Sequence, residues 1–342
     1  MDAATPGIEL SHAYFDDIVQ PILAEALSGT PYSAGRLGGG SDVLGLDDAT
    51  SRDHDWGLRV NLFVPTESVD AVAAELERRL PSSFRGHPTR FPFTGETDAR
   101  HHVDVDTVSR FAHSRLGFDP RDGVTVDDWL SLTGQAVLEM VAGPVFADHS
   151  GELAAVRARL GWYPDDVWRY VLACDWIRIA QELPLMGRAA DVGDETGSRI
   201  IAARLAHTVA HLAFMVERRW PPYAKWFGTC LRELAGADEL GAAIDEVLAG
   251  TDVGVRQRGI ARALDSLLDR QNAVGLTDAP VATVPFWDRP YLHPDPVIVE
   301  QLLDPIRDPV VRALPHGHGS IEQRTDTVDI LVDARARRRM IG

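Results

Sequence analysis

The chain has few cysteines, which build disulfides and metal-thiolate sites, and almost no lysine. It contains two cysteines, Cys174 and Cys230, and one lysine, Lys225. Both cysteines lie in apolar, helix-like stretches without metal-ligand spacing, so we expect free thiols and neither a disulfide nor a zinc site. A run of about 18 uncharged apolar residues is also missing, as is the basic-then-apolar pattern of a signal peptide. These absences predict a cytoplasmic protein with no membrane partner.

Positively charged residues are also fewer than negatively charged ones. The 34 Lys and Arg residues face 51 Asp and Glu residues, which gives a formal net charge of −17. Binding to a nucleic-acid duplex depends on clustered Lys and Arg, so the composition argues against a duplex partner and favours a neutral or cationic one. The basic cluster of Arg335, Arg337, Arg338 and Arg339 is expected to be a solvated tail.

The length of 342 residues and the pattern of apolar residues predict an α+β protein of two domains. Residues 1–120 combine an amphipathic helix bent at Pro21 with strands at 58–64 and 101–108, which indicates a small α/β domain. Residues 121–280 read as a helical bundle, with one helix running from Pro164 to about Gln181. Residues 281–342 are predicted to be a Pro-rich C-terminal segment, irregular up to residue 320, that packs on both domains.

One segment near the N-terminus carries a pattern of chemical interest. Gly40 and Ser41 form a Gly-Ser turn whose main-chain N–H groups and hydroxyl suit a terminal phosphate. Asp53 and Asp55 flank one residue just before a predicted strand, so period-two geometry points both carboxylates to the same side. Such carboxylates repel each other unless a divalent cation lies between them. Asp104, on the second strand, would complete a two-metal site.

The order of these residues resembles that of the DNA-polymerase-beta-like nucleotidyltransferases, which have a Gly-Ser pair, a spacer, Asp-x-Asp and a later strand aspartate. The resemblance implies that Ser41 contacts the triphosphate, that Asp53 and Asp55 bind two Mg²⁺ ions and that Asp104 is the third ligand. It favours Asp104 over Asp106, because the family places an apolar residue on each side of this ligand.

Four further segments look like a bacterial subfamily of this superfamily that is known only as a domain of unknown function. They are 51–57, the helix that follows 193–198, 222–228 and 322–326. A helical C-terminal domain is also similar in kind to that of the kanamycin-type and lincosamide-type nucleotidyltransferases, where the acceptor lies between two domains. The resemblance therefore implies transfer of a nucleoside monophosphate from an NTP, with ATP expected, to a small-molecule acceptor.

Other residues leave alternatives open. Lys225 lies beside Trp226 and Phe227, where it can reach a phosphate or simply cover the aromatic rings. His207 and His211 share a helical face but lack the Glu of His-Glu-x-x-His, so we expect no zinc there. No P-loop and no Gly-x-Ser-x-Gly motif occurs.

Two other functions compete with small-molecule transfer. The first is a regulatory module resembling the nucleotidyltransferase-fold antitoxins, which modify a partner protein. The second is a repurposed member that catalyses another reaction in the same pocket. The acceptor, the nucleotide base and the oligomeric state stay open.

Overall fold

The computed structural model describes residues 6–27, 29–47, 56–93 and 95–341. The chain forms two compact units. Unit 1 comprises Met1–Val124, Ala136–Gly161 and Val332–Arg335, and unit 2 comprises Thr125–Gln135, Trp162–Leu331 and Ala336–Gly342. The domain limits at 120 and 280 stay predictions, and the two units are described separately below.

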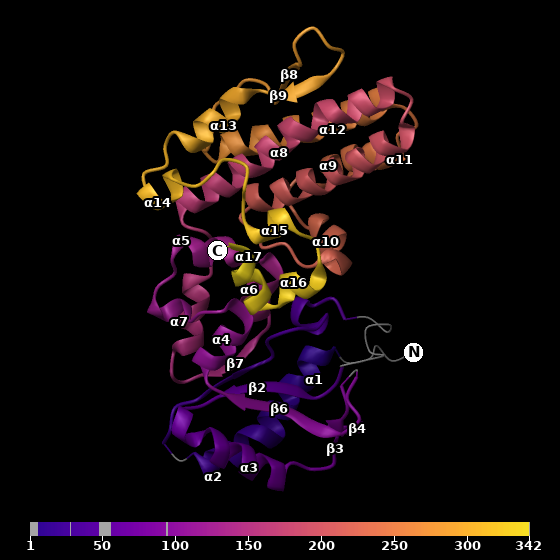
Figure 1. Cartoon of the computed structure of the whole chain (residues 1–342). Helices are drawn as coiled ribbons and strands as arrows, with labels where there is room; N and C mark the ends of the chain where they lie inside the picture. Colours follow the sequence, from indigo (N-terminus) through magenta and orange to yellow (C-terminus); the bar gives the residue numbers. More distant parts are fainter. Residues whose placement is uncertain (1–5, 28, 48–55, 94, 342) are drawn as a thin grey trace. The chain divides into compact units, whose positions relative to one another are not determined.

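Unit 1 is built on a five-stranded mixed sheet with the strand order β5-β6-β2-β1-β7. Its central strands β2 and β6 are parallel, and β1, β5 and β7 pair antiparallel with their neighbours. Figure 1 shows β2 and β6 side by side. The strands are β1 Ser33–Gly35, β2 Arg59–Phe63, β5 Arg90–Phe91, β6 Arg100–Asp106 and β7 Val145–Asp148. The strands predicted at 58–64 and 101–108 are thus confirmed, within a residue or two at each end.

The two faces of this sheet differ because side chains alternate along each strand. Val60, Leu62 and Val103 are buried and belong to the core that the N-terminal helices cover. Asn61 and Asp104 occupy the alternate positions and pair in register across β2 and β6. The polar pair therefore lies on the face opposite this core.

The N-terminal helical segment consists of α1 Gly7–Tyr14, a π-helical turn η1 Phe15–Val19, and α2 Gln20–Ala26. Pro21 has no N–H group to donate, and its ring crowds the carbonyl one turn earlier. The widened turn over η1 accommodates this proline. The predicted irregularity is therefore present, as a π-turn before Pro21.

Shorter elements complete unit 1 and its connection to unit 2. The crossover between β2 and β6 contains η4 Thr66–Ser68 and α3 Val69–Arg79, followed by the hairpin strands β3 Ser83–Phe84 and β4 His87–Pro88. The remaining elements are η2 Asp42–Leu44, α4 Val108–Leu116, η5 Pro120–Asp122, α6 Gly134–Val141 and α7 Glu152–Arg159.

Unit 2 is dominated by long helices, as the apolar periodicity predicts (Figure 1). These are α8 Asp165–Asp191, α9 Glu195–Val216, α10 Ala224–Leu231, α11 Ala237–Ala249 and α12 Val253–Ala273. The first starts directly after Pro164 but continues ten residues beyond the predicted end at Gln181. In α9, an 18-residue window is apolar enough for a membrane span, and 67% of that window is buried inside the structure.

The C-terminal residues are more regular than predicted. They form the hairpin β8 Thr283–Pro285 and β9 Leu292–Pro294 and the helices α13 Pro296–Leu303 and α14 Pro309–Arg312. Three short helices follow: α15 Ile321–Arg324, α16 Val328–Val332 and α17 Ala334–Ile341. Another short helix of unit 2, α5 Val126–Ser131, comes earlier in the chain. The prediction of an irregular stretch up to residue 320 was wrong, because Pro296 and Pro309 occupy first helical turns, where proline fits well.

The basic cluster at the C-terminus is not simply a solvated tail. Arg337 is fully buried, and its guanidinium donates to the carbonyls of Ser131 and Leu331. Arg338 forms an ion pair with Asp128. The prediction was wrong because a short charge run carries no information about carbonyl groups that lie far away in the sequence.

Candidate active site

The loop that follows β1 is organised around a buried arginine. Arg36 is fully buried, and its Nε and Nη2 atoms donate to the two carboxylate oxygens of Asp42 at 2.8 and 2.9 Å. The same guanidinium also donates to the carbonyls of Leu37 and Gly39. A bidentate pair with further acceptors satisfies the buried charge and fixes the path of the chain between residues 36 and 42.

Glycine is required at two positions around this loop. Gly40 has a φ of 139°, and a Cβ atom there would lie 2.2 Å from Asp42 Oδ1. A Cβ atom on Gly143 would lie 1.8 Å from the carbonyl oxygen of Arg36. The turn therefore depends on a glycine within the loop and on another that lets a distant segment approach it closely.

The loop leaves main-chain donors available. Within the described residues, the N–H groups of Gly39, Gly40 and Ser41 have no acceptor. Consecutive main-chain N–H groups in a tight turn form an anion-binding concavity, so this loop can bind a phosphate without contributing a positive charge. The phosphate contacts predicted for Gly40 and Ser41 are compatible with this geometry.

Strand β2 holds the loop at the polar face of the sheet. The N–H group of Leu37 donates to Asn61 Oδ1 at 2.8 Å, and Arg59 donates to the Gly39 carbonyl at 3.2 Å. Asn61 is in register with Asp104 on the adjacent strand β6. Parallel neighbours in register point their side chains to the same face, so the loop and Asp104 lie on one side of the sheet.

The carboxylates of Asp104 and Asp106 differ in the contacts that they make. The Asp104 carboxylate is 45% exposed and pairs only with the exposed side chain of Arg100, at 3.1 Å, among the residues described. Asp106 accepts from the N–H group of Thr107 at 2.8 Å and pairs with Arg110 at 3.0 Å. Asp106 thus stabilises the start of α4, whereas the Asp104 carboxylate has fewer contacts, and its role as a metal ligand stays a prediction.

Asp53 and Asp55 lie outside the described residues, so their predicted role is carried by the sequence alone. The residues on either side of this segment are close together, because Asp47 Oδ2 accepts from Trp56 Nε1 at 3.3 Å. The same oxygen accepts from the N–H group of Gly7 at 2.8 Å. Within the described residues, no group of three or more His, Cys, Asp and Glu side chains is arranged to hold a metal ion.

The two histidines before Asp104 are engaged elsewhere. His102 is fully buried, stacks on Phe93 with ring centroids 3.8 Å apart, and its Nε2 lies 2.8 Å from the carbonyl of Phe91. Burial lowers the pKa of His102. His101 lies 3.1 Å from Glu77. Both contacts favour a packing role over ligation.

The predicted residues of the helical half all belong to unit 2. Lys225 lies on α10, and its ammonium group is 4.8 Å from the centre of the Trp226 ring, so its side chain covers this ring. The binding of Lys225 to a phosphate stays a prediction. His211 is buried and pairs with Asp175 at 2.7 Å, while His207 stacks on Phe227. Arg199 and Arg204 form ion pairs with Glu195 and Glu182 on the exposed side of α9.

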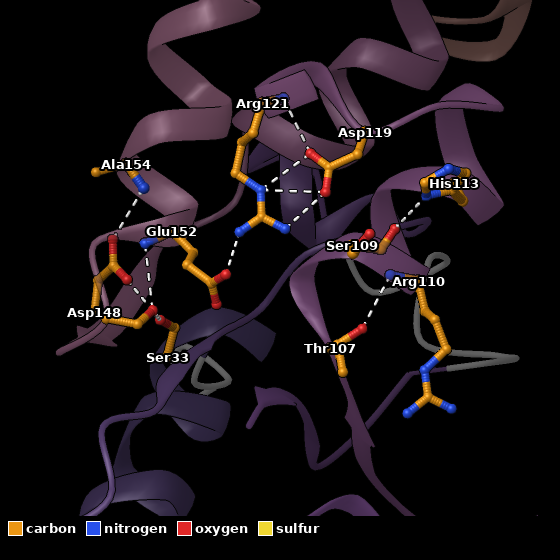
Figure 2. Close-up of polar contacts among 11 residues, drawn as sticks. Ser33, Thr107, Ser109, Arg110, His113, Asp119, Arg121, Asp148, Glu152 and Ala154 are labelled. Carbon is orange, nitrogen blue, oxygen red and sulfur yellow. Dashed lines mark hydrogen bonds and ion pairs between the residues drawn. The ribbon is translucent and has the colours of Figure 1, made fainter. Parts of the chain in front are cut away.

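A second polar cluster of unit 1 surrounds Arg121 (Figure 2). Its guanidinium donates to both oxygens of the buried Asp119, with an Nη2–Oδ2 distance of 2.7 Å, and also pairs with Glu152. The hydrogen bonds from Arg121 lower the pKa of Asp119 to about 2. Because these charges already pair with one another, the cluster fastens η5 to α7 and adds no ligand to the site.

Arg36 and Asn61 are the residues of the site that the sequence did not reveal. Arg36 stands in a Gly-rich stretch that reads as a flexible turn, and Asn61 is one polar residue in an apolar strand. The signal that could have found Arg36 is its spacing of six residues from Asp42 within a glycine-rich loop.

Comparisons with known proteins give a family match and a partial likeness to solved structures. Residues 129–227 match the family described as "Domain of unknown function (DUF4037)". No curated protein matches the chain. Among solved structures, the chain is similar to a nucleotidyltransferase-like protein from Exiguobacterium sibiricum 255-15, at 12% identity and a TM-score of 0.34, over 76% of this chain and 75% of that one. The helical segment from α5 to α10 is therefore similar to a family whose function is unknown.

Proposed function

We propose that the chain is a metal-dependent nucleotidyltransferase that moves a nucleoside monophosphate from an NTP, with ATP as the expected nucleotide, to a small-molecule acceptor. The observation that carries the proposal is the loop from Gly39 to Ser41, whose unpaired N–H groups lie on the same face of the sheet as the exposed carboxylate of Asp104. A phosphate site beside an available carboxylate is what phosphoryl transfer requires.

Each residue has a distinct part in this proposal. The N–H groups of the loop and the Ser41 hydroxyl bind the terminal phosphates, and Arg36 and Asn61 keep the loop in position. Asp104 would hold Mg²⁺ together with Asp53 and Asp55, which enter from the sequence pattern. When bound, the metal would lower the pKa of the acceptor group and neutralise the leaving pyrophosphate.

The net charge of the chain indicates which kind of acceptor it attracts. A chain with a net charge of −17 repels polyanions and attracts neutral or cationic molecules before any contact forms. We therefore propose a hydroxylated or aminated metabolite in preference to RNA or DNA. We also propose that Lys225 contacts a phosphate of the nucleotide.

The experiment measures pyrophosphate release and transfer of label from labelled ATP with Mg²⁺, in metabolite, protein and RNA pools. Asp104→Asn should reduce turnover at least about 100-fold, as expected when a preorganised electrostatic group is removed. Asp106→Asn is the matched control, because it changes the same strand and the same residue type. Asp53→Asn and Asp55→Asn should resemble Asp104→Asn.

Three results would count against the proposal. Turnover that survives Asp104→Asn but not Asp106→Asn would show that the ligand is misassigned. Label that appears only in protein would favour the regulatory module. Metal-dependent binding of ATP without release of pyrophosphate would favour a repurposed site.

A further inference from the structure

Unit 2 contains a polar pocket of about 440 Å³ that the proposed transfer reaction does not use. Its walls come from α8, from α9 and from the segment that begins with α15. The lining residues are Arg178, Ala203, Arg204, His207 and the run from Glu322 to Asp326. All of them belong to unit 2, and the volume lies within the range of about 300–1,000 Å³ that is typical of small-molecule sites.

The basic wall of the pocket carries positive charge that carboxylates do not fully neutralise. Arg178 and Arg204 share one carboxylate oxygen, Glu182 Oε1, at 3.4 and 2.6 Å. Arg324 donates to three main-chain carbonyls, at 2.9 to 3.2 Å, and pairs with no carboxylate among the described residues. Two guanidinium groups sharing a carboxylate and a third without one leave positive charge at this wall, which can bind an anionic group.

The acidic wall is formed by Glu322 and Asp326. Glu322 Oε1 accepts from the N–H group of Gly134, and Glu322 Oε2 forms an ion pair with Nε2 of the buried His211 at 3.6 Å. Asp326 is exposed and has no ion pair within the described ranges. Asp326 therefore leaves negative charge at this wall, which can bind a cationic group.

We propose that this pocket binds a free amino acid as a zwitterion, with its ammonium group at Asp326 and its carboxylate at Arg204 and Arg324. A ligand with only positive charge would lie against the three arginines of the lining. A ligand with only negative charge would lie against the two carboxylates. A zwitterion meets both walls with opposite charge, and it needs neither nucleotide nor metal, so this inference stands apart from the proposed transfer reaction.

Calorimetric titration of the full chain, without nucleotide or metal, tests the proposal with the free L-amino acids as probes. At least one should bind. Its amide, which lacks the carboxylate, and its N-acetyl derivative, which lacks the ammonium group, should each bind about 10- to 100-fold more weakly, since each loses charge-assisted hydrogen bonds.

Substitutions locate the site. Arg204→Gln and Asp326→Asn both change exposed side chains and should each weaken binding at least about tenfold. Arg199→Gln is the matched control: it lies on the same helix, pairs with Glu195, is 58% exposed against 55% for Arg204, and does not line the pocket. The control should bind as the unchanged chain does, with all variants melting as cooperatively as that chain.

The proposal is overturned if no amino acid binds, or if the amide and N-acetyl derivatives bind as tightly as the parent. It is also overturned if Arg204→Gln and Arg199→Gln change the affinity equally.

Discussion

Replacing Arg36 by methionine should destabilise unit 1 and loosen the phosphate-binding loop. The substitution leaves the Asp42 carboxylate, whose side chain is 7% exposed, without its counter-ion, and it removes the donor to the Leu37 and Gly39 carbonyls. Removing one partner of a buried ion pair costs about 3–5 kcal/mol, because the remaining charge stays buried. We expect a loss in this range in the free energy of unfolding.

The matched control is Arg78→Met. Arg78 pairs with Glu75 at 2.6 Å, but the arginine is 69% exposed, and exposed ion pairs contribute little to stability. The double variant Arg36→Met with Asp42→Leu should recover part of the loss, because it leaves no buried charge alone.

Urea unfolding measures the global effect, and hydrogen exchange of peptides covering residues 33–46 measures the local one, since the two units can unfold in separate transitions. Arg36→Met should speed exchange in these peptides. If Arg36→Met costs no more than Arg78→Met and leaves exchange in the loop unchanged, Arg36 does not organise this site.

Three further predictions concern unit 2. Gly241→Ala, inside α11 where a new Cβ atom would meet no atom within 4 Å, should raise the free energy of unfolding by about 0.5–1 kcal/mol in urea, and a loss would contradict the packing. Burial alone would lower the pKa of His211, but the Asp175 and Glu322 carboxylates raise it to about 10, so its stabilisation is full below its ordinary pKa of 6.5 and lost as pH rises through 10. His211→Gln should therefore flatten the fall in stability between pH 7 and pH 10, and an unchanged slope would refute the assignment. Lys225 is the one lysine, so peptide mapping after acylation tests its role: ATP with Mg²⁺ should slow its modification if it contacts a phosphate, and an unchanged rate would exclude this contact.

Much of the architecture follows from local signals in the sequence. The helix that begins after Pro164 and the strand that carries Asp104 both lie where apolar periodicity and proline chemistry place them. These signals suffice because backbone hydrogen bonding and capping involve residues only a few positions apart. The family resemblance also favours Asp104 over Asp106 as the third ligand, and this choice remains a prediction. Asp53 and Asp55 remain predictions from the sequence pattern.

The tertiary structure decided which polar groups are buried and with what partners. Asn61 holds the loop through Leu37, and Gly143 allows the approach of Arg36, although these residues are far apart in the sequence. Arg337 is buried for the same kind of reason, since its acceptor at Ser131 lies 206 residues away. A buried charge is stable only where the fold brings acceptors to it, and periodicity carries no record of such distant partners.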